Sequence, residues 1–153
     1  MKRPKPLKLL AAEPADLQIL SAALQDAAGL IGDFVYEPKA RRFTVALNRY
    51  RWEAKVNGRG ERVRAALQFG GVLSAKSQRL RQGAKDAVVA LLALEFEPDA
   101  DPESPGGVLT LTFAGGGALA LEVECIDAAL ADVSQPWRAA ARPDHERGDR
   151  GEP

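Results

Sequence analysis

Cysteine and histidine are almost absent from this chain of 153 residues, which contains one of each. A single cysteine cannot form an internal disulfide bond, and one cysteine with one histidine cannot supply the four ligands of a structural zinc site. The chain is long enough to bury roughly two-thirds of the surface that it exposes when unfolded. We therefore expect one domain that folds around a hydrophobic core in a reducing cytoplasm.

Long apolar runs are also missing. The first residues are basic, as in a signal peptide, but the apolar run from Leu9 to Ala12 ends at Glu13 and Pro14. No other run approaches the ~20 apolar residues of a membrane span. The sequence predicts a soluble cytoplasmic protein that is neither exported nor bound to a membrane.

Net charge is zero, with 21 basic and 21 acidic residues, but the two signs are segregated. Between Lys39 and Lys85 the sequence has thirteen Lys and Arg against two Glu. Between Asp86 and Trp137 it has ten Asp and Glu and no Lys or Arg. The charge pattern leaves open an anionic partner, pairing within the chain, and pairing between copies.

The clearest structural element is a hairpin between Val108 and Val123. Two segments of alternating apolar and polar residues flank the three glycines at 115–117. On the second arm the apolar residues share one face, because side chains alternate along a strand; they are Leu119, Leu121, Val123 and Cys125. A hairpin is marginal alone, so we expect the rest of the chain to extend the sheet.

Apolar residues at every second position predict further strands at 7–11, 31–37, 42–52, 62–69, 72–77 and 87–96. Tyr50 and Trp52 are out of phase with Phe43 and Leu47, which predicts a bulge near Asn48. Residues 87–96 are apolar on both faces, which favours a central strand covered on both sides, with a buried helix as the alternative.

Two helices are expected. The first begins at Pro14 and ends at Gly29, with an apolar stripe of Leu17, Leu20, Leu24 and Ala27. A short C-terminal helix is predicted by the spacing of Ile126, Leu130 and Val133.

The predicted fold class is α+β. Seven or eight mainly antiparallel strands form a bent sheet or small barrel, with one helix after the first strand and the short helix at the C-terminal end. Strands followed by a terminal helix are similar to a pleckstrin-homology-like barrel, in architecture alone. The domain is expected at 7–137, after a basic arm at 1–6 and before a charged, mobile tail at 138–153.

Few residues suggest catalysis or metal binding. His145 is the first candidate for a general base, but the charged tail offers nothing to hold it near a partner. Cys125 lies on an apolar strand face, where a cysteine usually acts as a small hydrophobe. The run from Asp99 to Glu103 resembles the start of a calcium loop but is followed by neither its glycine nor its final glutamate. The sequence therefore indicates no catalytic residue, metal or cofactor.

A stronger signal is the run Asn-Arg-Tyr-Arg-Trp at 48–52. Guanidinium groups neutralise phosphates, and aromatic rings between them can stack on bases, as in proteins that bind single-stranded nucleic acid. The candidate anion-binding residues are Arg42, Arg49, Arg51, Arg62 and Arg64. In one alternative the aromatic rings belong to the core and the arginines are solvated. In another, Arg62 and Arg64 pair across strands with Glu122 and Glu124.

Three segments carry a resemblance to a known family: the run Leu-Asn-Arg-Tyr-Arg-Trp-Glu at 47–53, the glycine hairpin at 113–126 with its Glu-Val-Glu-Cys arm, and Arg-Pro-Asp-His at 142–145. Together they resemble a family of short bacterial proteins, mostly alphaproteobacterial, that is classed as a domain of unknown function. The resemblance covers residues 7 to about 145. It implies no activity, cofactor or site residue, and it favours docking of 142–145 on the domain over a mobile tail.

We expect a non-enzymatic binding or scaffold module, because the sequence places no pair of titratable groups beside a nucleophile or metal ligand. In a sharper form of this hypothesis, the module binds RNA or another phosphate ligand through the five arginines. The first alternative is a small-molecule enzyme that uses Glu122, Glu124 and Asp127 as acid and base. The second is a homodimer in which a basic edge meets the acidic stretch Glu95–Glu103 of another copy.

Overall fold

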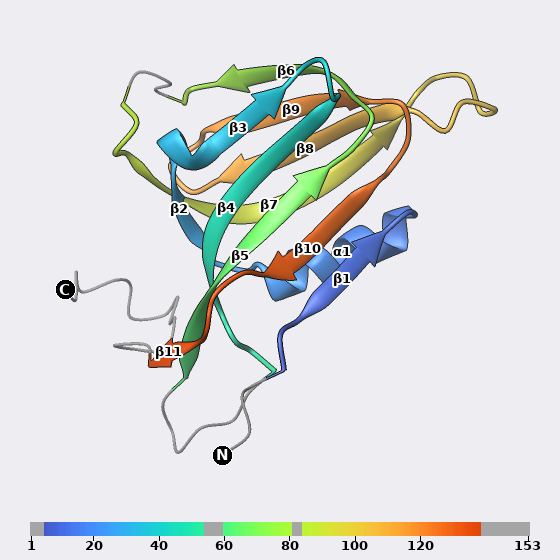
Figure 1. Ribbon diagram of the computed structural model, residues 1–153. Coiled ribbons are helices and arrows are strands. Elements are labelled where there is room, and N and C mark those ends of the chain that lie inside the picture. Colours follow the sequence, from blue (N-terminus) through green and yellow to red (C-terminus); the bar gives the residue numbers. More distant parts are fainter. Residues whose placement is uncertain (1–4, 54–59, 81–83, 139–153) are drawn as a thin grey trace.

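The computed structural model describes residues 5–53, 60–80 and 84–138, which form eleven strands and one α-helix (Figure 1). The expected arm at 1–6 and tail at 138–153, with the candidate His145 and the segment 142–145, therefore lie wholly or mostly outside the described residues. The helix is α1 (Pro14–Ala23). The strands are β1 (Lys8–Ala11), β2 (Ala28–Leu30), β3 (Phe34–Glu37), β4 (Arg42–Tyr50), β5 (Glu61–Phe69), β6 (Val72–Gln78), β7 (Val88–Pro98), β8 (Gly107–Phe113), β9 (Ala118–Val123), β10 (Ala128–Asp132) and β11 (Trp137–Arg138).

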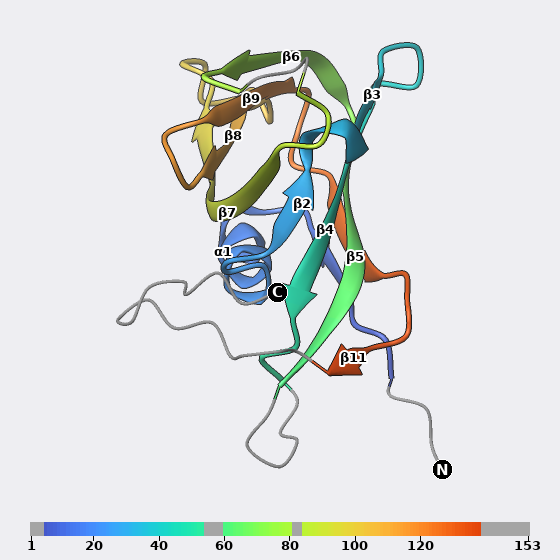
Figure 2. The same cartoon turned by 90° about the vertical axis from the view of Figure 1, so that its left-hand side faces the viewer.

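All strands belong to one strongly bent antiparallel sheet, whose two halves are joined by β2. One half has the order β1-β10-β5-β4, with β3 beside β4, and the other has the order β7-β8-β9-β6. Because β2 pairs with both β4 and β7, it is the link between them. Figure 2 shows the two halves facing each other with α1 between β7 and the half that contains β5. The end strands β1 and β6 do not pair in the described part, so the sheet is open and not a closed barrel.

The core fills the space between the two halves. Alternate residues of β4, β5, β8 and β9 point into it, as expected for strands with one solvated face. The helix adds Leu17, Leu20 and Leu24, all buried. The predicted glycine hairpin is β8–β9, and the strands expected at 31–37 and 42–52 pair across the turn between them as the hairpin β3–β4. These predictions and that of a helix after the first strand are confirmed.

The helix is shorter than predicted, because it ends at Ala23 and not at Gly29. The chain turns at Asp26, which has a φ of 61°, and then enters β2. Gly29 has a different role there. A Cβ atom at this position would lie 2.5 Å from the carbonyl oxygen of Ala46. Gly29 therefore permits the close approach of β2 to β4.

The predicted C-terminal helix is wrong. Residues 128–132 form β10, which pairs with β1 on one side and with β5 on the other. Ala128 and Leu130 are buried, while Ala129 and Ala131 are partly exposed, so the burial has the period of a strand. Pairing with two strands outweighs the helix propensity of the alanines.

The predicted count of seven or eight strands was also too low. Without a terminal helix in the described part, the likeness to a pleckstrin-homology-like barrel is lost.

The interpretation of residues 87–96 was half right. They lie in strand β7, so the alternative of a buried helix is wrong. However, Val88 is 68% exposed and Leu92 is 52% exposed, so the strand is not covered on both faces. The helix α1 covers the opposite face, where Leu91 and Leu94 are buried. No helix in the described segments is long and apolar enough to cross a membrane.

Candidate functional site

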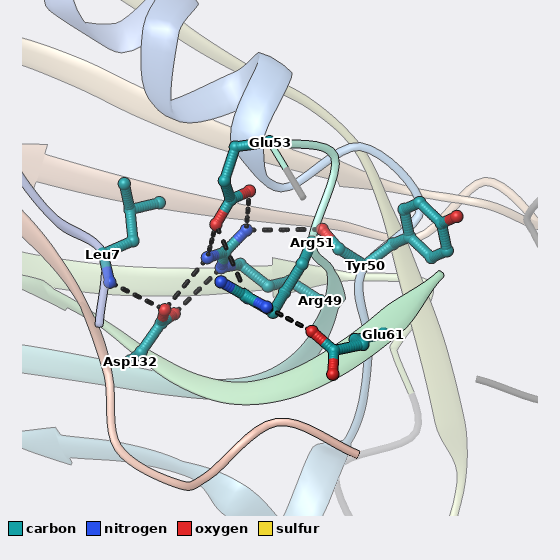
Figure 3. Close-up of polar contacts among 7 residues, drawn as sticks. All are labelled: Leu7, Arg49, Tyr50, Arg51, Glu53, Glu61 and Asp132. Carbon is teal, nitrogen blue, oxygen red and sulfur yellow. Dashed lines mark hydrogen bonds and ion pairs between the residues drawn. The ribbon is translucent and has the colours of Figure 1, made fainter. Parts of the chain in front are cut away.

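Arg49, one of the predicted anion-binding residues, has no exposed surface. The predicted bulge near Asn48 is absent, because β4 and β5 stay in register through Arg49 and Val63. Arg49 therefore takes the next inward position after Leu47, where the sequence pattern predicts an apolar residue. Its guanidinium group lies between the carboxylates of Asp132 and Glu53 (Figure 3).

All five N–H groups of the Arg49 guanidinium have acceptors. Nε and Nη2 donate to Asp132 at 2.9 Å each. Nη1 and Nη2 donate to Glu53 at 3.0 and 2.7 Å, and Nη1 also donates to the carbonyl oxygen of Tyr50 at 3.3 Å. Burial alone would lower the pKa of Arg49, but the hydrogen bonds to the two carboxylates hold it above its ordinary value.

The partners of Arg49 connect distant parts of the chain. The side chain of Asp132, in β10, is only 2% exposed and also accepts the backbone N–H of Leu7 at 2.8 Å. The side chain of Glu53 is 42% exposed, and its hydrogen bond to Arg49 lowers its pKa. This arginine network, made of Arg49, Asp132 and Glu53, fastens β4 to β10 and to the residue before β1.

Arg51 and Arg62 lie beside this network, and Nε of Arg51 is 3.8 Å from the carboxylate of Glu53. Arg51 is almost buried and forms an ion pair with Glu61. The guanidinium carbon of Arg62 lies 5.9 Å from the ring centroid of Tyr50, at cation–π distance, and burial lowers the pKa of Arg62. The buried ring of Tyr50 also meets the ring of Trp52, with centroids 4.6 Å apart. Tyr50 is thus part of the packing and does not offer its ring to a base.

The other two predicted arginines are more exposed and are also paired. Arg42 contacts Glu37 across the β3–β4 hairpin at 3.1 Å. Arg64 contacts Asp33 at 3.0 Å and the side-chain oxygen of Asn48 at 3.3 Å. At one end of β4 and β5, Arg49 points into the core, while Arg62 and Arg64 share the opposite face of the sheet. Arg42 lies at the other end of β4.

The cross-strand pairing of Arg62 and Arg64 with Glu122 and Glu124 is wrong, because β5 and β9 are not neighbours in the sheet. Glu124 instead pairs with Arg41. The basic and acidic segments do meet within one chain, through Arg41–Glu124 and Arg49–Asp132.

The other candidate residues lie at or near the surface, in β9 and in the segment that follows it. Glu122, Glu124 and Asp127 are exposed, and Cys125 is a partly buried free thiol. Within residues 5–53, 60–80 and 84–138, no three His, Cys, Asp or Glu side chains are grouped so that they could hold a metal ion.

A pocket of about 430 Å³ opens between β3 and β6, the strands at which the two halves of the sheet come together without pairing. The view along the sheet in Figure 2 shows both strands at the same end of the molecule. Aromatic and aliphatic side chains dominate the lining, which consists of Ile31, Gly32, Phe34, Tyr36, Phe43, Ala75, Ser77, Leu80, Lys85 and Leu119.

Ring contacts hold the walls of the pocket. Phe34 packs on the fully buried Phe113 with ring centroids 5.7 Å apart, and Tyr36 packs on Phe43 at 5.8 Å. Small residues on β6, Ala75 and Ser77, leave the space open. Sequence reasoning missed this pocket, because β3 and β6 pair with different strands and nothing local indicates that they face each other. The aromatic alternation in β3 and the small residues in β6 were its only sequence signals.

A family model described as "Protein of unknown function (DUF2948)" matches residues 7–145 of the chain. No curated protein and no solved structure matches it.

Proposed function

We propose, given that the chain belongs to the DUF2948 family of proteins of unknown function, that it is a non-enzymatic binding module for a small, largely apolar ligand. The ligand site is the pocket between β3 and β6. The observation that carries the proposal is the combination of an open apolar cavity with few polar groups.

Size and chemistry of the pocket both support this function. Small-molecule sites have volumes of ~300–1,000 Å³, and the pocket of about 430 Å³ lies in that range. Such sites are lined mainly by apolar and aromatic groups, with a few polar groups that orient the ligand. Here the polar side chains of the lining are those of Tyr36, Ser77 and Lys85.

The anion-binding form of the hypothesis has less support. A phosphate contact requires an accessible guanidinium, but Arg49 and Arg51 are buried against carboxylates. Arg42 and Arg64 are accessible, yet each is already paired with an acidic residue. An enzyme that uses Glu122, Glu124 and Asp127 is less supported too, because none of these side chains lines the pocket.

Progressive filling of the pocket tests the proposal. Phenylnaphthylamine, a neutral aromatic amine whose fluorescence rises in apolar surroundings, is titrated into the wild type and into Ala75→Leu and Ala75→Phe. We expect saturable binding to the wild type and an affinity that falls as the side chain grows, by about tenfold or more for phenylalanine.

The matched control is Ala120→Phe. Ala120 lies opposite Lys76 in the β6–β9 pair, on the other face of the sheet from Ala75, so this variant should bind like the wild type. Thermal unfolding of each variant shows whether the fold is intact. Equal affinity in folded Ala75→Phe, or no saturable binding to the wild type, would refute the proposal.

A further inference from the structure

We propose that the ligand of the pocket is an anionic amphiphile, an apolar or aromatic molecule with a carboxylate, sulfonate or phosphate group held by Lys85. This inference rests on the proposed function, since it names the chemical class that the same pocket selects. The site would hold the apolar body between β3 and β6 and the anion at the rim.

Among the described residues that line the pocket, Lys85 is the sole charged one. A lysine ammonium group presents three donors and no acceptor, so its natural ligand is an anion. Within the described part of the chain, no carboxylate forms an ion pair with Lys85, in contrast to Arg42, Arg51 and Arg64.

The backbone places Lys85 at the pocket through a specific contact. Its carbonyl oxygen accepts the N–H of Gly32 at 2.9 Å, and the N–H of Ile31 donates to the carbonyl oxygen of Ala87 at 3.0 Å. A Cβ atom on Gly32 would lie 2.9 Å from both the Cβ atom and the carbonyl oxygen of Lys85. Gly32 therefore permits a close approach that fixes the base of the lysine against the turn Ile31–Asp33.

The nearby acidic groups leave the ammonium group of Lys85 available to an anion. Asp33, next to the lining residue Gly32, forms an ion pair with Arg64 at 3.0 Å. Asp86 follows Lys85 in the sequence but does not line the pocket. Ser77 adds a hydroxyl group to the lining. The described lining thus combines one cation and the hydroxyl groups of Ser77 and Tyr36 with apolar and aromatic side chains.

Two probes that differ by one sulfonate group distinguish the contribution of the anion to binding from that of the apolar body. Anilinonaphthalene sulfonate carries a sulfonate on the ring system of phenylnaphthylamine, which is neutral. Both are titrated into the wild type, Lys85→Met, Lys85→Glu and the control Lys76→Met, whose lysine lies on the outer face of β6.

We expect Lys85→Met to weaken binding of the sulfonate by about two- to fivefold, as for the loss of an exposed ion pair, and Lys85→Glu to weaken it further. Added salt should weaken the sulfonate complexes of the wild type and of Lys76→Met, which keep Lys85, and should not weaken that of Lys85→Met. Binding of the neutral probe should change by less than about twofold in every variant. Lys76→Met should match the wild type with both probes.

Two results would overturn the inference in different ways. If both probes bind and neither responds to Lys85, the pocket is a ligand site but does not select anions. If neither probe binds the folded wild type, the proposed function fails and this inference with it.

Discussion

Replacing Arg49 by methionine is expected to destabilise the fold by about 3–5 kcal/mol, the usual cost of removing one partner of a buried ion pair. The carboxylate of Asp132 is 2% exposed and receives two hydrogen bonds from Arg49. Without them it keeps only the backbone N–H of Leu7, at 2.8 Å, among its described donors. Urea unfolding of the full chain measures the loss.

Arg42→Met is the matched control, since Arg42 lies on the same strand and is paired with Glu37 at the surface. Exposed pairs contribute about 0–1 kcal/mol, so this variant should stay near the wild type. Adding Asp132→Asn to Arg49→Met should recover part of the loss, because the amide keeps an acceptor for Leu7 and carries no charge. Equal unfolding midpoints for Arg49→Met and Arg42→Met would show that the arginine network does not hold the fold.

Arg49→Met should also differ from the wild type in how its stability depends on pH in the acid range. The pKa of Glu53 lies below its ordinary value of 4.5, chiefly because Arg49 donates hydrogen bonds to it. A carboxylate with a lowered pKa in the folded state stabilises the protein above its ordinary pKa, and this stability is lost as the pH falls through the folded-state value. Arg49→Met should therefore lose this part of the acid dependence. A stability profile parallel to that of the wild type below pH 5 would contradict the assignment.

The second large effect is expected for Phe113→Ala, at about 3–5 kcal/mol of unfolding free energy. Phe113 ends β8 with no exposed surface and packs against Phe34 in the pocket wall. Truncation removes apolar contacts and leaves a cavity between the two halves of the sheet, which relaxation fills only partly.

Phe96→Ala is the control for this variant, because Phe96 lies on the paired strand β7 but is only partly buried. It should lower the free energy of unfolding clearly less than Phe113→Ala does in the same urea or thermal unfolding experiment. If the two truncations were equally costly, Phe113 would not be part of the rigid support of the pocket.

Local alternation of apolar residues was enough to predict most of the strands. In β4, Phe43, Val45 and Leu47 are buried at every second position, and the glycine hairpin has the same regularity in β8 and β9. These elements could be predicted because a strand with one solvated face must bury alternate side chains.

The rule failed where a charge occupies an inward position. Arg49 continues the buried series of β4, but the sequence rule assigns a charged residue to the surface unless its partner is known. That partner, Asp132, is 83 residues away. With Arg49 assigned to the surface, the aromatic pair Tyr50 and Trp52 was assigned to the inward face, and this shift of phase led to the wrong prediction of a bulge.

Long-range pairing also explains the other errors. The alanine-rich segment 128–132 has local helix propensity, yet β1 and β5 provide partners on both sides and make it a strand. The pocket depends on two strands that face each other without hydrogen bonding, so no sequence spacing could reveal it. The family resemblance, by contrast, was recognised from short motifs and is confirmed over residues 7–145.

In the proposed division of roles, the arginines hold the fold while the pocket between β3 and β6 binds the ligand. Amide NMR of the full wild-type chain during titration with phenylnaphthylamine tests it most directly. We predict saturable shifts concentrated in β3, β6 and the turn Ile31–Asp33, with little change around Arg49 and Arg51. Saturable shifts centred on Arg49 and Arg51 instead, or no saturable shifts at all, would contradict it.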